Sequence, residues 1–363
     1  MSAHHTHITR GPLVLASAVA LVVSAACGGS NKEKYLENGA TPEQGLVAAA
    51  SQGDNDAVEA FLDEGVPVNA QKTDGTTPLM AAAEHGHADT VTLLIESGAD
   101  INAMKPDGWM AIIAAAQSGN TDVTRVLLDK GANPNSATKD GFTPLMAASQ
   151  RGAEEVVALL LDKGAMVDAR NRDGWTALMA AIEPGDAEIV RILIDKGANP
   201  NQANVDGWTV LMAAAQAGQA DAVKVLLEKG ARPDVANRDG WTALMASAEK
   251  GDENVVKALL DGGADPNART KDGWTALMSA ADKGHAEMAS LLVERGAKTD
   301  FKSKENRTAL AYAERGGHQD VIDALRKTTP AATSGTEDGG GADKASADKK
   351  TPPKPAARKR TRG

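Results

Sequence analysis

Aromatic residues at a regular spacing are the part of this sequence best suited to bind a ligand. Each of the five tryptophans directly follows an Asp-Gly pair, and they lie 33 residues apart except for one step of 66, where a phenylalanine fills the intermediate place. We call these six residues the aromatic row: Trp109, Phe142, Trp175, Trp208, Trp241 and Trp274. Their chemistry is non-covalent, because aromatic faces stack on other rings and attract cations. The row therefore predicts a binding surface.

Two roles for the aromatic row stay open. The rings could lie across the neighbouring turns and simply cover backbone and apolar side chains. Alternatively, half-buried rings form a pre-ordered contact surface for a protein or peptide, since tryptophan with arginine nearby is typical of interface hot spots. Four cations directly precede Asp-Gly pairs and are expected to lie beside the rings: Lys139, Arg172, Arg238 and Lys271. Sugar rings also stack on tryptophan, so a glycan is the alternative ligand.

The sequence lacks the motifs of catalytic and metal sites. It contains no G-x-S-x-G, no H-E-x-x-H and no G-x-x-x-x-G-K-[ST]. Its one cysteine, Cys27, excludes a disulfide within the chain and a zinc site built from cysteines. The histidines beyond residue 30 fall near predicted turns, where we expect structural roles: His85, His87, His285 and His318. We therefore expect no enzymatic activity, no metal and no cofactor.

Charge is distributed unevenly along the chain. Of 363 residues, 39 are Lys or Arg and 49 are Asp or Glu, for a formal net charge of −10. The last fifteen residues hold seven of the basic residues and no acidic one, so the remainder carries −17. This acidic body argues against nucleic acid as a partner, because binding to phosphates requires a basic surface.

The first residues are similar to an export signal. Arg10 and three histidines precede an apolar run over 12–23 that ends in small residues, the order found in secretory signals. The end reads V-S-A-A-C-G-G and resembles a bacterial lipoprotein signal, in which the cysteine is lipidated, although Ser24 stands where that family usually has an apolar residue. We expect a signal peptide over 1–26, a lipid on Cys27 and a flexible tether over 27–40. The alternative is ordinary cleavage nearby, which would leave a free thiol.

The body of the chain repeats with a period of 33 residues. Asp-Gly pairs mark the period, and their aspartates are Asp74, Asp107, Asp140, Asp173, Asp206, Asp239 and Asp272. The register predicts eight full units over 41–304 and a shortened ninth unit to about 327. A fixed period of this length indicates stacked units, each of which buries its apolar face only against its neighbours.

Each unit contains the signals of two short helices. In the unit over 173–205, Thr176 can cap the first helix with its hydroxyl, and Gly185 ends it. Asp186 can cap the second helix, and Gly197 follows it as the expected left-handed cap. Apolar residues recur between these caps at the spacing of one helical face.

These units resemble ankyrin repeats. One of them, over 140–165, reads D-G-F-T-P-L-M-A-A-S-Q-R-G-A-E-E-V-V-A-L-L-L-D-K-G-A. The resemblance covers residues 41–327 and implies an all-α repeat solenoid of stacked helix-turn-helix units with β-turn fingers. It also implies a concave and finger side on which partners bind. The family therefore implies a non-enzymatic scaffold for a protein or peptide partner.

The units depart from the family at three places. The family's T-P-L-H histidine, which links adjacent repeats by hydrogen bonds, is replaced by a methionine row that we expect to pack in the core: Met80, Met146, Met179, Met212, Met245 and Met278. The second unit has Met110 in place of the capping threonine and Ile113 in place of the methionine. The fourth unit has Pro184 near the end of its first helix and should have a shorter helix.

The C-terminal residues differ in composition from the body. Residues 328–363 are rich in Thr, Ala, Gly, Pro and Lys, which predicts a disordered basic tail. The tail could contact anionic lipid or polysaccharide, or it could serve only to keep the chain soluble. Together the segments predict an interaction scaffold, secreted across the inner membrane and lipid-anchored at the bacterial envelope, with an envelope structural or glycan-binding protein as the alternative.

Overall fold

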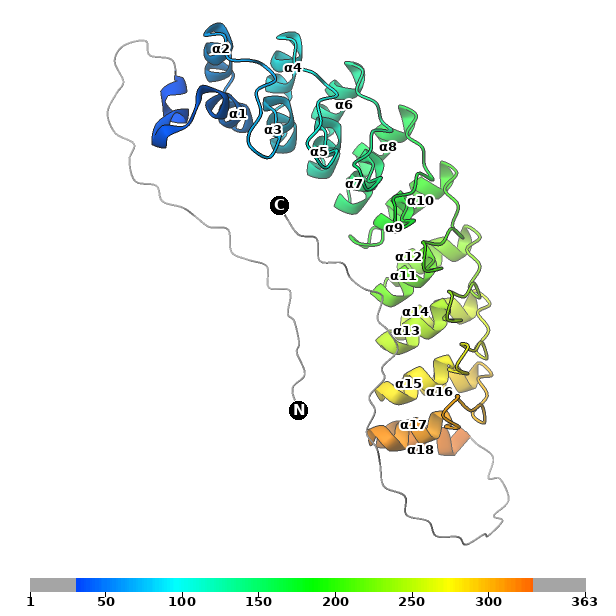
Figure 1. Cartoon of the computed structure of the whole chain (residues 1–363). Helices are drawn as coiled ribbons and strands as arrows, with labels where there is room; N and C mark the ends of the chain where they lie inside the picture. The colour runs from blue at the N-terminus through cyan, green and yellow to red at the C-terminus, as the bar shows by residue number, and fades with distance from the viewer. Residues whose placement is uncertain (1–30, 329–363) are drawn as a thin grey trace, which may run out of the picture.

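The computed structural model describes residues 31–328, which form an arc of nine helix pairs (Figure 1). The inner helices are α1 (Pro42–Gln52), α3 (Pro78–His85), α5 (Ala111–Ser118), α7 (Pro144–Arg151), α9 (Ala177–Ala180), α11 (Val210–Ala217), α13 (Ala243–Lys250), α15 (Ala276–Lys283) and α17 (Ala309–Gly316). The outer helices are α2 (Asn55–Asp63), α4 (Ala88–Glu96), α6 (Thr121–Asp129), α8 (Glu154–Asp162), α10 (Ala187–Asp195), α12 (Ala220–Glu228), α14 (Glu253–Asp261), α16 (Ala286–Glu294) and α18 (Gln319–Thr328). Over these residues no strand forms, and the predicted all-helical repeat solenoid is confirmed.

The helix boundaries follow from capping residues. The Thr176 hydroxyl accepts a hydrogen bond from the Met179 backbone N–H at 3.3 Å, and Asp186 caps α10 by accepting from the Glu188 N–H at 2.9 Å. Gly197 follows α10 with a φ of 98°, which a residue with a side chain rarely adopts. The caps predicted at Thr176, Asp186 and Gly197 are therefore confirmed, whereas Gly185 does not end the first helix, because α9 stops earlier, at Ala180.

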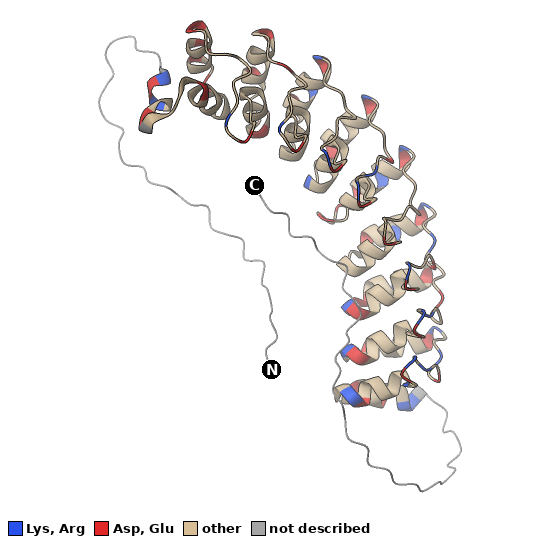
Figure 2. Cartoon of the chain, in the orientation of Figure 1, with Lys and Arg blue, Asp and Glu red and all other residues tan. Residues whose placement is uncertain are grey.

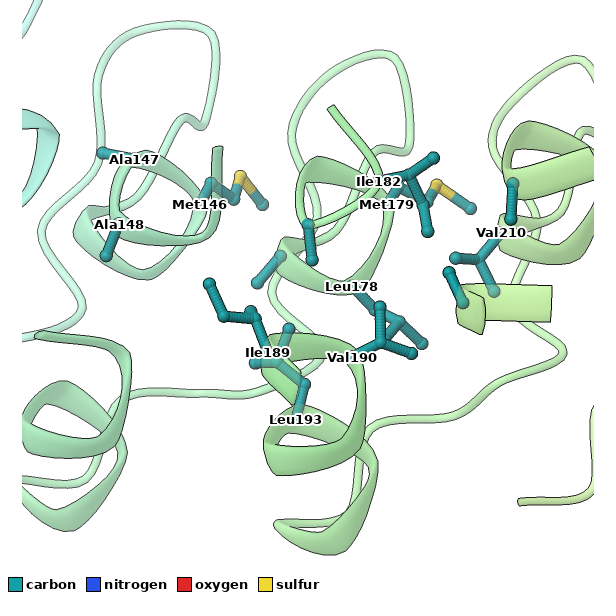
Figure 3. Packing of buried hydrophobic residues seen from close by; sticks show 14 of the residues in the cluster. Met146, Ala147, Ala148, Leu178, Met179, Ile182, Ile189, Val190, Leu193 and Val210 are labelled. Atoms are coloured by element: carbon teal, nitrogen blue, oxygen red, sulfur yellow. The ribbon is translucent and has the colours of Figure 1, made fainter. Parts of the chain in front are cut away.

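The methionine row packs in the core between repeats. All six methionines are buried, and Figure 3 shows Met146 extending from α7 toward α9 and Met179 extending from α9 toward α11. Around them the core is built mostly from Ala, Leu, Val and Ile. The prediction of apolar packing at this position is confirmed, because a flexible thioether side chain fills the space between two stacked helices.

Polar links between repeats are made by two of the histidines for which structural roles were expected. The residue that follows the glycine cap of the inner helix reaches back to a backbone carbonyl of the preceding repeat. His87 Nε2 donates to the Ser51 carbonyl at 3.0 Å, and His318 Nε2 donates to the Asp282 carbonyl at 3.0 Å. These bonds satisfy carbonyl groups at the ends of inner helices, which have no partner within the helix. Because His85 Nδ1 also donates to the Ala81 carbonyl at 2.9 Å, three of the four histidines form structural hydrogen bonds.

The helix that contains Pro184 is short, as predicted. α9 has four residues, whereas the inner helices on either side have eight. Proline lacks the N–H that would bond to the carbonyl of Ala180, and its ring would collide with that carbonyl in a regular helix. The chain from Ala181 to Gly185 therefore forms turns.

Replacing Pro184 with alanine should lengthen α9 and stabilise the protein by about 1 kcal/mol. The free energy gained from the restored helical turn should exceed the stabilisation lost when proline no longer restricts the unfolded chain. Pro144→Ala is the matched control, since Pro144 occupies the first turn of α7, where its missing N–H is not needed. Urea unfolding and far-UV circular dichroism measure both changes. Equal effects of the two substitutions would contradict this account of α9.

The N-terminal end of the array is covered by two short 3-10 helices, η1 (Asn31–Tyr35) and η2 (Glu37–Gly39). The Tyr35 hydroxyl donates to Asp54 at 3.1 Å, and the Lys34 ammonium pairs with the same carboxylate at 2.7 Å. Lys32 also pairs with Glu64. The prediction of a flexible tether over 27–40 is therefore wrong for residues 31–40, because these side chains fasten the segment to the first repeat.

Several predicted features lie outside the described residues. They are the signal peptide, Cys27 with the start of the tether, and the tail beyond α18.

Candidate functional site: the aromatic row

Each tryptophan is held in a finger, the tight turn between one outer helix and the next inner helix. In the finger that carries Trp208, the Asn204 N–H donates to the Trp208 carbonyl at 2.9 Å, and the Asn204 side-chain oxygen accepts from the Trp208 N–H at 2.9 Å. Asn171 and Asn237 make the same pair of bonds to Trp175 and Trp241. The Asn-x-Asp-Gly-Trp sequence therefore fixes the backbone from which the ring projects.

Backbone hydrogen bonds join neighbouring fingers into a continuous wall. The Val205 N–H donates to the Asp173 carbonyl at 3.0 Å, and the Lys271 N–H donates to the Asp239 carbonyl at 3.0 Å. The same bond recurs between the Arg172 N–H and the Asp140 carbonyl at 2.9 Å. Because each finger is tied to the next, the spacing of the aromatic row is set by the fold and is not free to adjust.

The rings lie against the inner helices and are half-buried. The Trp274 indole N–H donates to the Ser279 hydroxyl of α15 at 2.7 Å, and its ring meets Tyr312 of α17 edge-on, with the centroids 4.5 Å apart. Trp109 and Phe142 stack on one another, with centroids 6.4 Å apart and planes 11° apart. Trp175 is the most open, with 38% of its surface exposed. Packing thus occupies part of each ring and leaves the rest accessible.

Four of the five indole N–H groups are free to bind a ligand. The position of Ser279 is held by alanine in the repeats of the other tryptophans: Ala114, Ala180, Ala213 and Ala246. Alanine offers no hydroxyl, and no hydrogen bond to another described residue is formed by the indole N–H of Trp109, Trp175, Trp208 or Trp241. The small side chain also leaves room for the ring above it. The row therefore combines aromatic faces with hydrogen-bond donors.

Within residues 31–328, the basic residues beside the fingers do not lie over the tryptophan rings as expected. Arg172 instead pairs with Asp140 of the preceding fingertip at 3.0 Å. The cation–ring contacts found over residues 31–328 involve Tyr35, Phe61, Phe301 and Tyr312, and none involves a tryptophan. The prediction of cations beside the tryptophan rings is therefore wrong, and for Arg172 the reason is that the Asp140 carboxylate lies within its reach.

Comparison with protein families decides the identity of the repeats. A model of three consecutive ankyrin repeats matches the chain over residues 21–105, 46–138, 131–204, 197–270 and 256–334. The chain belongs to the ankyrin-repeat family. Ankyrin repeats bind protein partners generally, and they are typically non-enzymatic interaction modules. No catalytic family is indicated, and no curated protein matches the chain significantly.

Two residues that the sequence analysis missed lie beside the aromatic row of the ankyrin array. Tyr312 is 1% exposed, and its hydroxyl lies 2.8 Å from that of Ser303, while burial raises the pKa of the phenol. It covers the last ring of the aromatic row. Val205 stands at a fingertip where the other central fingers have Lys or Arg, and it is 44% exposed. Both deviate from the repeat consensus, which was the available signal.

Neither a metal site nor a membrane-spanning helix is found in the described part of the ankyrin-repeat chain. No group of three or more His, Cys, Asp or Glu side chains between residues 31 and 328 is arranged to hold a metal ion. None of the helices over this range has the length and hydrophobicity that crossing a bilayer requires. The aromatic row is therefore the candidate site that the fold leaves to consider.

Proposed function

We propose that this chain is a non-enzymatic interaction scaffold of the bacterial cell envelope that binds a protein or peptide partner along the aromatic row. The observation that carries the proposal is the row itself, in which half-buried rings with free indole N–H groups stand on linked fingers. Rigid aromatic groups lose little conformational entropy on binding, which is why they are common at interface hot spots. The ankyrin fold supports a protein partner in general terms.

The envelope location rests on the first residues of the chain. The charged start, the apolar run over 12–23 and the cysteine after small residues are the reasons to place a lipid on Cys27. A lipid there would hold the array at the membrane, because each buried methylene contributes about 0.8 kcal/mol.

A glycan is the less favoured ligand. Sugar rings bind tryptophan by lying flat on an open aromatic face. The Trp109 and Phe142 rings stack on one another, and Trp274 is covered on one side by Tyr312. Ring contacts thus occupy part of the row at both ends, and only the three central tryptophans offer open faces, fewer than a long polysaccharide would use.

A photo-crosslinking residue at the exposed fingertip position of Val205 tests this function in cells. We expect a discrete protein adduct, because this position adjoins Trp208 without replacing any ring of the row. The control places the same crosslinker at Arg125, which is exposed on the outer helix α6. Equal labelling from both positions, or adducts to glycan alone, would overturn the proposed protein partner.

A further inference from the structure

The three central fingertips combine aromatic rings with carboxylates that differ in ion pairing from those on either side. Asp140 pairs with Arg172, and Asp272 pairs with Lys304 at 3.3 Å. By contrast, no ion pair is formed within the described residues by the fingertip carboxylates Asp173, Asp206 and Asp239. Each stands two residues before a tryptophan.

Val205 removes one positive charge from the central fingertips. It occupies the position from which Arg172 and Lys304 pair with the preceding fingertip, so Asp173 lies opposite a valine and not a cation. Asp206 and Asp239 lie opposite Arg238 and Lys271, whose side chains form no ion pair with them in the described structure. Residues 31–328 carry 30 Lys or Arg and 45 Asp or Glu, which gives this array a formal charge of −15. Figure 2 shows that the charges gather at helix ends and loops, while the inner helix surfaces between them are uncharged. A ligand with both cations and flat apolar groups would match the central fingers.

The chain itself contains a segment with this chemistry. Residues 349–363 read K-K-T-P-P-K-P-A-A-R-K-R-T-R-G, with seven Lys or Arg and no acidic residue. Lysine and arginine can pair with the fingertip carboxylates and lie over the tryptophan faces. Prolines favour an extended conformation and pack well in aromatic-lined grooves.

The segment is long enough to reach the row. The last helix, α18, pairs with α17, whose Tyr312 touches the Trp274 ring. Twenty residues separate the end of α18 at Thr328 from Lys349. A chain of that length spans up to about 70 Å, whereas the whole aromatic row covers about 50 Å at ordinary helix-packing distances.

We propose that residues 349–363 bind to the aromatic row of the same molecule, centred on Trp175, Trp208 and Trp241. The segment then competes with the partner, so a partner must displace it before binding. This inference rests on the proposed function, because it takes the row to be a binding surface, and it adds that the preferred ligand is a basic, proline-containing peptide. Tethering favours the bound state, since a linked segment acts at an effective concentration near millimolar.

Tryptophan fluorescence is a direct test, because all five tryptophans of the chain lie in the row. In the full chain, replacing the seven basic residues of 349–363 with glutamine should raise the acrylamide quenching constant about twofold, as the tethered segment leaves the rings. The control replaces the four lysines of the segment with arginine, which keeps its charge and should leave quenching unchanged. A synthetic peptide of residues 345–363 should saturably protect the glutamine variant.

The outcomes separate this inference from the proposed function. Equal quenching of the full chain and the glutamine variant, with no saturable effect of the peptide, would overturn tail binding. Protection that rises with protein concentration would also overturn it, because the segment would then come from a second molecule. If tail binding fails while the Val205 crosslink to a partner persists, only this inference is lost. If the tail protects the rings and no protein is crosslinked, the proposed function is lost.

Discussion

Replacing Trp208 and Trp241 together with alanine should weaken partner binding by a hundredfold to a thousandfold, because each central hot-spot aromatic contributes roughly 2 kcal/mol. Neither indole N–H group has a partner within the described residues, so both are available to donate to a ligand. The helices should remain, since each ring packs on only one part of an inner helix surface. The measurement is capture of the crosslinked partner, compared with far-UV circular dichroism of the same variant.

The control for this loss is a variant that lowers the free energy of unfolding by a similar amount but leaves every residue of the aromatic row unchanged. Ile192→Ala with Leu260→Ala removes two half-buried side chains from the outer helices α10 and α14. We expect each pair of substitutions to lower stability by a few kcal/mol. If the outer-helix variant loses the partner as well, destabilisation explains both losses and the binding role of the row is refuted.

Much of the fold could be predicted because it depends on local signals that repeat. The threonine caps, the glycines after each helix and the apolar spacing are each satisfied within one unit or by its immediate neighbour. Even the short helix before Gly185 follows from one proline. The methionine row could be placed in the core because its position in the helical face is fixed by the register.

The parts that could not be predicted depend on which side chain meets another across a repeat boundary. The 33-residue period places Arg172 next to a finger, but it does not say whether that cation turns to a ring or to Asp140. The link from His87 to Ser51 crosses 36 residues and lies outside the family motif that was compared. The N-terminal cap was missed because Tyr35 and Lys34 lie before the first repeat and have no periodic equivalent.

Close packing between neighbouring fingers predicts a large loss of stability when a fingertip glycine is replaced. Gly108→Ala should destabilise the array by about 3 kcal/mol, because it combines a left-handed backbone with a collision. Gly108 has a φ of 89°, and a Cβ there would lie 2.7 Å from the Lys139 nitrogen and 2.9 Å from the Thr138 Cα. These are backbone atoms of the next finger and cannot rotate away. The hydrogen bond from the Lys139 N–H to the Asp107 carbonyl, 2.8 Å long, would be lost.

Gly98→Ala measures the cost of the left-handed backbone alone, without the collision. Gly98 has a similar φ of 90°, but a Cβ there would meet no atom within 4 Å, so the cost should be only about 1–2 kcal/mol. Urea unfolding measures the difference between the two variants, and equal losses would contradict the finger-to-finger contact.

Because each repeat is stabilised only by its neighbours, the Gly108 variant should also unfold in two steps, with the repeats before the altered finger unfolding separately from those after it. Stern–Volmer analysis should then show increased exposure of Trp109 in that variant, since its ring depends on Phe142 of the displaced finger.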